Sequence, residues 1–403
     1  MKTIPFKNKF ITVGVAAALM MTGCTNHSSL LAAGKEEPQE ERTGAVKEAK
    51  APVQVYLSDI KGHWGEQSIQ QAIEAGYVDG YEDGTFRPDS DITRAEYVTM
   101  VTKAMGLNPL KKNSDDQWYD PYISAVVNAG YHRYSDFNNG TWDTPITRLE
   151  MARIAVRASN EERQSADNQT SDEELMFLAT KTGMITGMAD GQLGKEETAT
   201  RAQSVTIIQR ILDLKEGKEL EVDKRAASYA EVEWRNTNME SILGVLPEEF
   251  PMDLSYGAEV DVTLKQVLVV DMEDPDAAFR SWFPKVIKKY DASESINDYL
   301  IAMELTFSNN TLREGYWDSS QYFGAGYHFN EAIIDPDVQE QTHVKYIEMY
   351  SMKKHFNGSG WLLMTMSKTE VEDRISTGDF WIDISNRYEP QKGFNYLTKP
   401  MRE

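Results

Sequence analysis

The stretch Asp91-Ile92-Thr93-Arg94-Ala95-Glu96 decides how the first half of this chain is predicted to fold. It recurs as Ile146-Thr147-Arg148-Leu149-Glu150 and again as Ala199-Thr200-Arg201-Ala202-Gln203. The three arginines are 54 and then 53 residues apart, and a near-constant period of this size is typical of stacked repeats. The sequence therefore predicts three copies of one structural unit.

Each copy has the features of a helix start. A threonine followed three residues later by Glu or Gln, ahead of an apolar-periodic run, is the capping-box pattern. The threonine hydroxyl accepts a hydrogen bond from the N3 amide, and the N3 side chain accepts one from the amide of the threonine. Because such a cap contributes about 1 kcal/mol, Thr93 and Glu96 have a structural role that needs no ligand.

The arginine at the first helical position has two possible roles. The helix macrodipole already places about half a positive charge there, so helix formation gives no reason for a cation. A guanidinium beside free helix amides makes a strong site for a carboxylate or a phosphate. Alternatively, the arginine pairs with an acidic residue of a neighbouring unit, because its planar fork binds an internal carboxylate equally well.

The charge of the chain restricts its partners. Its 403 residues carry a formal net charge of -22, which argues against nucleic acid and anionic membrane surfaces as ligands because both would repel it. An anionic ligand would therefore need a local basic pocket. The hydrophobic fraction of 40% is that of a folded chain, and the length allows two or three domains.

The single cysteine, Cys24, follows a segment that has the form of a secretory signal. Basic residues open the chain, and the apolar run 10–21 is shorter than the roughly 20 residues of a spanning helix. The ending Met21-Thr22-Gly23-Cys24 resembles the lipobox of bacterial lipoproteins. This resemblance implies that residues 1–23 are removed and that lipid-modified Cys24 anchors the protein at the extracellular face of the cell membrane. An ordinary signal peptide is the alternative.

Residues 24–54 contain mixed charge, two prolines and no apolar periodicity, so we expect a flexible tether. Each following unit, over residues 55–108, 109–165 and 166–216, is predicted to be a helix, a turn-rich loop and a second helix. Trp64 and Trp118 each lie 30 residues before the arginine of their unit, whereas Ser171 holds this place in the third.

An opening from Asp59 to Trp64, the loop Gly80-x-x-Asp83-Gly84-x-Phe86-x-Pro88 and the stretch Thr93-Arg94-Ala95-Glu96 together resemble the S-layer homology (SLH) module. The resemblance covers roughly residues 55–215, and the first unit has nearly the full pattern. It implies an all-α, pseudo-threefold bundle of three SLH repeats whose grooves bind secondary cell-wall polysaccharide. In many members the bound sugar carries a pyruvate ketal, whose carboxylate meets the motif arginine.

The resemblance assigns carbohydrate-binding roles to eight residues. They are Arg94, Arg148 and Arg201 for the carboxylate, Trp64 and Trp118 as aromatic walls, and Asp59, Gly80 and Asp83 for polar and backbone contacts. The second unit lacks the Asp-Gly pair and the third lacks the tryptophan and the Phe-x-Pro loop, so we expect one or two working grooves. The alternative is a purely structural role, in which the tryptophans are core residues and Asp83 belongs to a turn.

The C-terminal region has a different character. A charged linker is predicted at residues 217–228, and alternating or apolar runs within residues 229–403 predict strands at 260–270, 299–307, 344–352, 361–366 and 380–384. Asn357-Gly358-Ser359-Gly360 reads as a hairpin turn, and only residues 276–290 look helical. We therefore expect a β-rich domain, which we take to be a sandwich.

No catalytic motif appears in this region. His328, His343 and His355 have no metal-ligand spacing, and the acidic residues of the 79–90 loop fail the EF-hand pattern, so no cofactor or metal is expected. We predict a non-enzymatic lipoprotein that binds an anionic cell-wall polysaccharide and displays its C-terminal domain, whose partner is unknown. The alternatives are a wall-acting enzyme, such as a polysaccharide hydrolase, and a structural tie between membrane and wall.

Overall fold

The structure is a computed structural model that describes residues 57–137, 141–254, 260–309, 315–318, 329–346, 349–352, 357–385 and 394–399. These residues belong to one compact unit. The predicted signal peptide, Cys24 and the whole predicted tether lie outside the described residues, as do His328 and His355.

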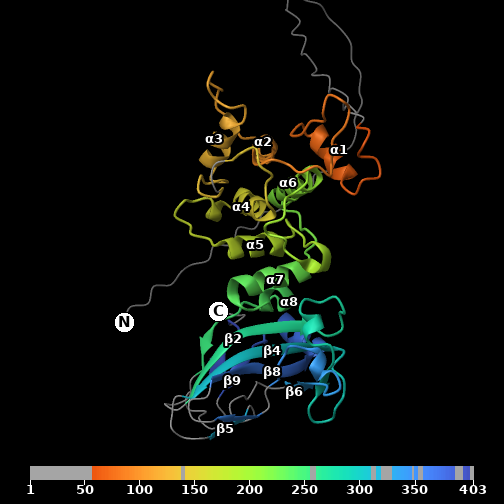
Figure 1. Cartoon of the computed structure of the whole chain (residues 1–403), viewed down its shortest axis with the longest axis vertical. Coiled ribbons are helices and arrows are strands. Elements are labelled where there is room, and N and C mark those ends of the chain that lie inside the picture. The colour runs from red at the N-terminus through yellow and green to blue at the C-terminus, as the bar shows by residue number, and fades with distance from the viewer. Residues whose placement is uncertain are drawn as a thin grey trace, which may run out of the picture. The chain divides into compact units, whose positions relative to one another are not determined.

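Helices dominate the described chain up to residue 243 (Figure 1). They are α1 (Glu66–Glu74), α2 (Arg94–Ala104), α3 (Asp120–Asn128), α4 (Arg148–Ser159), α5 (Asp172–Lys181), α6 (Arg201–Lys215), α7 (Lys224–Arg235) and α8 (Met239–Leu243), with short 3₁₀ helices at Glu161–Arg163 and Ala189–Gly191.

The three repeated stretches begin α2, α4 and α6, as predicted. Thr93, Thr147 and Thr200 each accept a hydrogen bond from the N3 amide, and the N3 side chain of each helix accepts one from the threonine's own amide. All three capping boxes are thus complete. The arginine follows directly as the first helical residue in every case.

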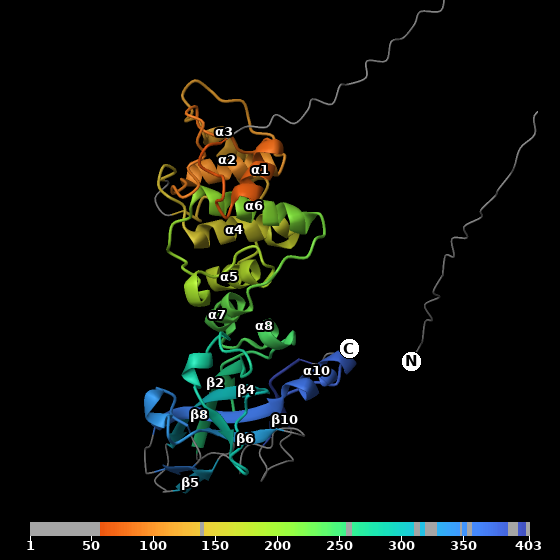
Figure 2. The same ribbon diagram turned by 90° about the vertical axis from the view of Figure 1, so that its right-hand side faces the viewer.

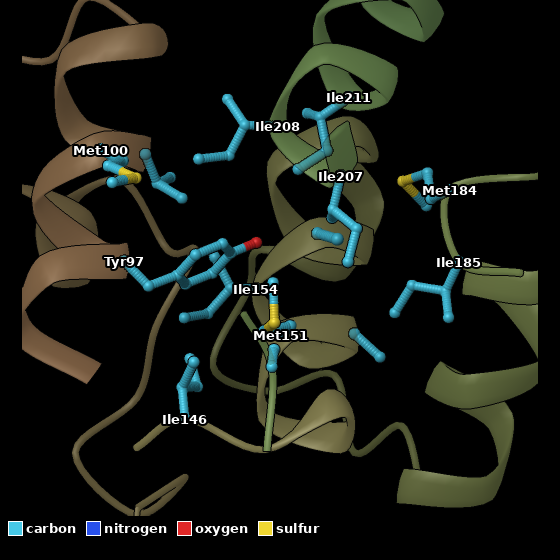
Figure 3. Packing of buried hydrophobic residues seen from close by; sticks show 14 of the residues in the cluster. Tyr97, Met100, Ile146, Met151, Ile154, Met184, Ile185, Ile207, Ile208 and Ile211 are labelled. Atoms are coloured by element: carbon cyan, nitrogen blue, oxygen red, sulfur yellow. The ribbon is translucent and has the colours of Figure 1, made fainter. Parts of the chain in front are cut away.

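The segments that lead into these helices are joined in a closed cycle. The amide of Ile92 donates to the carbonyl of Ala199, Ala199 donates to Ile146, and Ile146 donates back to Ile92, at 3.0 to 3.1 Å. Side chains of α2, α4 and α6 pack together beside this cycle, with Tyr97, Met151 and Ile208 fully or almost fully buried (Figure 3). The cycle therefore sets the three helix starts against one another.

Two further helices extend the helical part beyond the repeated stretches. Trp234 of α7 stacks on Phe177 of α5 at 5.3 Å between ring centroids. Glu231 is fully buried, and its carboxylate accepts from the amides of Glu240 and Ser241 at the start of α8. Four orphan amides begin every helix, so this carboxylate satisfies two of those of α8.

The described residues then form a six-stranded antiparallel sheet in the order β1-β2-β4-β8-β6-β3. Figure 2 labels β2, β4, β6 and β8 of this sheet. The strands are β1 (Met252–Asp253), β2 (Val260–Asp271), β3 (Val286–Lys288), β4 (Asp298–Asn309), β6 (Asn330–Ile334) and β8 (Asn357–Ser367). Two separate antiparallel pairs are β5 (Gly315–Asp318) with β7 (Met349–Met352), and β9 (Asp383–Ser385) with β10 (Phe394–Tyr396).

Both faces of the sheet are apolar and covered. One face packs with α8, α10 (Lys368–Thr377) and the segment around Phe380 and Ile382. The other packs with the irregular segment around Phe279 and Phe283 and with Val344. Strands buried on both faces read as continuous apolar runs, which is why β4 and β8 stand out in the sequence.

The predicted fold class, an all-α three-repeat bundle followed by a β sandwich, is wrong. The helical residues are linked by short β-bridges such as Thr93 with Pro145, and they continue into α7 and α8, which lie outside the repeats. Among the described residues, helices and irregular segments cover most of the large sheet, where a sandwich would have a second sheet. The repeat period marks only the helices that begin with the motif, so it missed α7, which packs into the helical core, and α8, which packs against the sheet.

Smaller predictions also fail. Residues 276–290 form turns, a 3₁₀ helix at Arg280–Trp282 and strand β3 instead of a helix. The expected turn at 357–360 is the start of β8, where Gly358 and Gly360 pair with Phe307 and Leu305. Glycines next to polar residues favour a turn locally, but the pairing with β4 overrides this preference.

Candidate functional site

The guanidinium of Arg94 is already bound by an internal carboxylate. Its Nε and Nη2 donate to the two carboxylate oxygens of Glu150, at 3.0 and 2.5 Å, and Nη1 donates to the carbonyl and hydroxyl oxygens of Thr141. Both ionised side chains are about nine-tenths buried. Glu150 is the N3 residue of α4, so the capping acid of one helix pairs with the arginine of another.

Arg201 is enclosed in a similar way. Its Nε donates to the carbonyl of Phe86 at 3.0 Å, and its Nη1 lies 3.6 Å from the carboxylate of Glu96, the N3 residue of α2. The guanidinium carbon lies 4.9 Å from the ring centroid of Tyr81 and 4.7 Å from that of Phe86. Arg201 is therefore held between rings and a carboxylate of the first unit.

Arg148 breaks this pattern because Gln203, not an acid, occupies the N3 position of α6. Its Nε donates to the carbonyl of Leu193 at 2.9 Å and its Nη2 to that of Thr186 at 2.6 Å. Among the described residues no carboxylate lies within ion-pair distance of its guanidinium. The buried charge of Arg148 is thus compensated only by neutral carbonyl groups.

A cavity of about 170 Å³ opens beside Arg148. Its walls come from α4, α6, the loop at 185–188 and the turn before α1, and include Trp64, Arg148, Thr186, Met188, Gln203 and Arg210. Arg210 adds a second guanidinium, which donates to the carbonyl of Met184 at 3.3 Å. We call this cavity the Arg148 groove.

The Arg148 groove is electropositive. Burial lowers the pKa of both Arg148 and Arg210, although a nearby Glu221 partly opposes the effect at Arg210. Arginine remains protonated at physiological pH even so. Two partly desolvated guanidinium groups therefore face a small cavity in a chain that is acidic as a whole, which suits an anionic ligand.

Trp64 lies at the edge of this groove with 62% of its surface exposed. His63 packs beside it at 5.1 Å between ring centroids. A second, open concavity runs from His63 and Trp64 along α1, past Glu66 and Gln70. A large exposed aromatic ring next to an electropositive pocket can stack on the apolar face of a sugar. Trp64 is therefore a surface residue and not part of the core.

The other predicted site residues lie elsewhere. Asp59 accepts from the amides of Phe86 and Arg87, so it holds the loop, and a Cβ at Gly80 would approach Leu57 to 2.5 Å. Asp83 bonds Thr85 and Arg87, and these hydrogen bonds lower its pKa to about 2. Trp118 is 47% exposed and packs edge-on against Tyr119. Their carbohydrate-binding role stays a prediction.

The structure thus brings together only Trp64 and Arg148 of the predicted residues in this groove. Sequence reasoning missed Arg210, Thr186 and Met188. Arg210 has no motif of its own, and its place follows from helical geometry, since it lies on α6 beyond Arg201 and Gln203. The one available signal was the glutamine at N3, where the other two stretches have glutamate.

Comparison with known proteins matches the S-layer homology domain family to residues 57–98. The chain is 33% identical over 121 residues to the S-layer protein sap of Bacillus anthracis, covering 28% of this chain and 15% of that protein. It is 37% identical over 108 residues to the cellulosome-anchoring protein of Acetivibrio thermocellus, covering 25% and 23%. It is 28% identical over 178 residues to exoglucanase XynX of Acetivibrio thermocellus, covering 40% and 16%.

These matches show that the chain carries an S-layer homology domain. The family match ends at residue 98 and so spans only the first of the three predicted units, which adds to the correction of the fold class. The chain spans less than a quarter of the length of each relative named above. In the described residues, no helix is long and apolar enough to cross a membrane.

Proposed function

We propose that this protein attaches itself to the bacterial cell wall by binding an anionic wall polysaccharide in the Arg148 groove. The observation that carries the proposal is the missing carboxylate: Arg94 and Arg201 each face an acid at N3 of another helix, whereas Arg148 faces Gln203. An unpaired buried guanidinium is costly, so a ligand that supplies a carboxylate gains a strong charge-assisted interaction.

The remaining donors of the groove fit this ligand. Nε and Nη2 of Arg148 donate hydrogen bonds to carbonyl groups, and Nη1 has no hydrogen-bond partner among the described residues. A carboxylate on a sugar, such as that of a pyruvate ketal, would accept from Nη1, and Arg210 lines the same cavity and adds a second positive charge. Trp64 would then cover one face of the sugar ring.

The relatives support the same assignment at a coarser level. They include an S-layer protein, a cellulosome-anchoring protein and an exoglucanase, which differ in what they do but share similarity with this chain's S-layer homology region. We therefore propose surface attachment as this chain's role, and display rather than catalysis as the role of the sheet region.

The wall proposal is tested by sedimentation of the full-length mature chain with purified wall sacculi, before and after acid extraction of the secondary polysaccharide. Binding should depend on the polysaccharide and should fall strongly in Arg148→Ala. Arg374→Ala, which removes an arginine paired with Glu370 on α10, is the matched control. Equal binding to stripped sacculi would overturn the proposal. Sugar or peptide released from the walls by the same protein would instead favour the enzyme.

We also propose that the sequence around Cys24 is a lipoprotein signal and that residues 24–54 tether the protein to the outer face of the membrane. About 30 residues could reach about 100 Å when fully extended, which would let the anchored protein contact the wall. Mass spectrometry of detergent-extracted protein should find a lipid on Cys24. Cys24→Ala should release the protein from membranes without affecting its binding to sacculi.

A further inference from the structure

A second concavity, of about 550 Å³, lies between α7 and two irregular segments, 190–195 and 279–282. Its volume is within the range of ligand-binding pockets, which is about 300 to 1,000 Å³. It shares no lining residue with the Arg148 groove, although the carbonyl of Leu193, which lines this concavity, accepts from Nε of Arg148. We call it the α7 cleft.

Three aromatic side chains form the apolar wall of the α7 cleft. Tyr229 and Phe279 meet edge to face at 5.0 Å between centroids, and Phe279 meets Trp282 in the same way at 5.1 Å. Each ring therefore fixes the orientation of its neighbour. Phe279 has φ of +62°, a backbone conformation that favours glycine, and such strained residues concentrate at ligand sites.

The charged side chains at this cleft are balanced in pairs. Lys195 and Glu233 form an ion pair at 2.7 Å across the cleft wall. Asp190 lies 3.7 Å from Arg225, which also bonds the hydroxyl of Tyr229. Unlike the Arg148 groove, the α7 cleft thus has no excess of positive charge, and an anionic ligand would have to displace Glu233 from Lys195.

We propose that the α7 cleft binds an uncharged saccharide. The aromatic wall suits the apolar faces of sugar rings, and the carboxylate of Glu233 and the ammonium of Lys195 can accept from and donate to hydroxyl groups. Lys195 and Glu233 are partly exposed, and a purely apolar ligand would remove their remaining contacts with water without replacing them, at a cost of about 1 to 3 kcal/mol each. The cleft is therefore a second sugar site with a preference opposite to that of the Arg148 groove.

The proposal is independent of wall attachment and is tested on the full-length mature chain. Cellobiose, maltose, the N-acetylglucosamine dimer and, as an anionic probe, glucuronic acid are titrated while tryptophan fluorescence and heat of binding are recorded. At least one uncharged disaccharide should bind and shift the fluorescence of Trp282, and glucuronic acid should not compete with it.

Glu233→Gln tests the site, because it removes the charge but keeps the shape of a side chain that is 45% exposed. Affinity should fall about 3- to 10-fold, the effect of one hydrogen bond. The exposed Glu372→Gln on α10 is the matched control and should bind both the disaccharide and sacculi as the unmodified protein does. Failure of all uncharged probes to bind, or binding that Glu233→Gln leaves unchanged, would overturn the proposal.

Discussion

Gln203→Glu is expected to abolish most wall binding while leaving the fold intact. Glutamate and glutamine can each serve as the N3 partner of a capping box, as Glu150 does in α4 and Gln203 does in α6. The substitution therefore keeps the start of α6. Nε and Nη2 of Arg148 donate to carbonyl groups, so the new carboxylate would meet its Nη1, as Glu96 meets Nη1 of Arg201 at 3.6 Å. The substitution would therefore place an internal acid where the ligand's carboxylate is proposed to bind.

The magnitude follows from that geometry. A hydrogen bond to a charged group contributes about 1.5 to 3 kcal/mol, so losing one such ligand contact lowers affinity roughly 10- to 150-fold. The assay is sedimentation with purified sacculi over a range of protein concentrations, together with urea unfolding to verify stability. Gln169→Glu, which adds the same charge at an exposed position, should bind as the unmodified protein does.

The reciprocal change provides the internal comparison. Glu150→Gln removes the acid that now occupies Arg94, so it should not weaken wall binding even though it destabilises the fold. If Gln203→Glu binds sacculi with unchanged affinity and is folded, the unpaired guanidinium of Arg148 is not the anchor for the wall polymer, and the reasoning fails.

Three further outcomes are expected. Arg94→Ala should destabilise the protein by about 3 kcal/mol because it leaves Glu150 buried and unpaired; urea unfolding measures this, and lost wall binding at normal stability would contradict it. Trp64→Ala should weaken wall binding by about 1 kcal/mol without changing the melting temperature, since Trp64 is 62% exposed; a lowered melting temperature would indicate a core role. His132 is buried beside Asp136, Arg94, Arg153 and Arg157, and desolvation lowers its pKa to about 4, so the unfolded chain takes up the proton first. The contribution of neutral His132 to the free energy of unfolding should thus be fully present above about pH 6.5 and fall by about 3 kcal/mol as the pH drops towards 4. In His132→Gln, the free energy of unfolding measured with urea should change less with pH over this range.

The sequence predicted the helix starts well because their determinants are local. Thr93 and Glu96 lie within one turn of each other, so a capping box can be recognised without knowing what the helix packs against. β2, β4 and β8 were also found, since a strand in the middle of a sheet has a long apolar run. α10 was missed because it has only one fully buried side chain, Val371, and thus a weak pattern.

The candidate site was predicted only in part. Trp64 and Arg148 were named, but so were Arg94 and Arg201, whose guanidinium groups face internal acids. The three arginines look alike in sequence, and the distinction depends on a residue more than 50 positions away on another helix. The α7 cleft was not predicted at all, because Tyr229, Phe279 and Lys195 come from segments without a shared motif.

The starts of α2, α4 and α6, each with an arginine at the first helical position, follow from the sequence alone, because capping and helical periodicity act over a few residues. Which of the three arginines has no acidic partner among the described residues depends on how the helices pack. Coulomb attraction depends on distance in space, and the closed cycle of Ile92, Ile146 and Ala199 sets each arginine against the N3 residue of another helix. That residue is glutamate for Arg94 and Arg201 but glutamine for Arg148, and this difference leaves Arg148 without an acidic partner among the described residues.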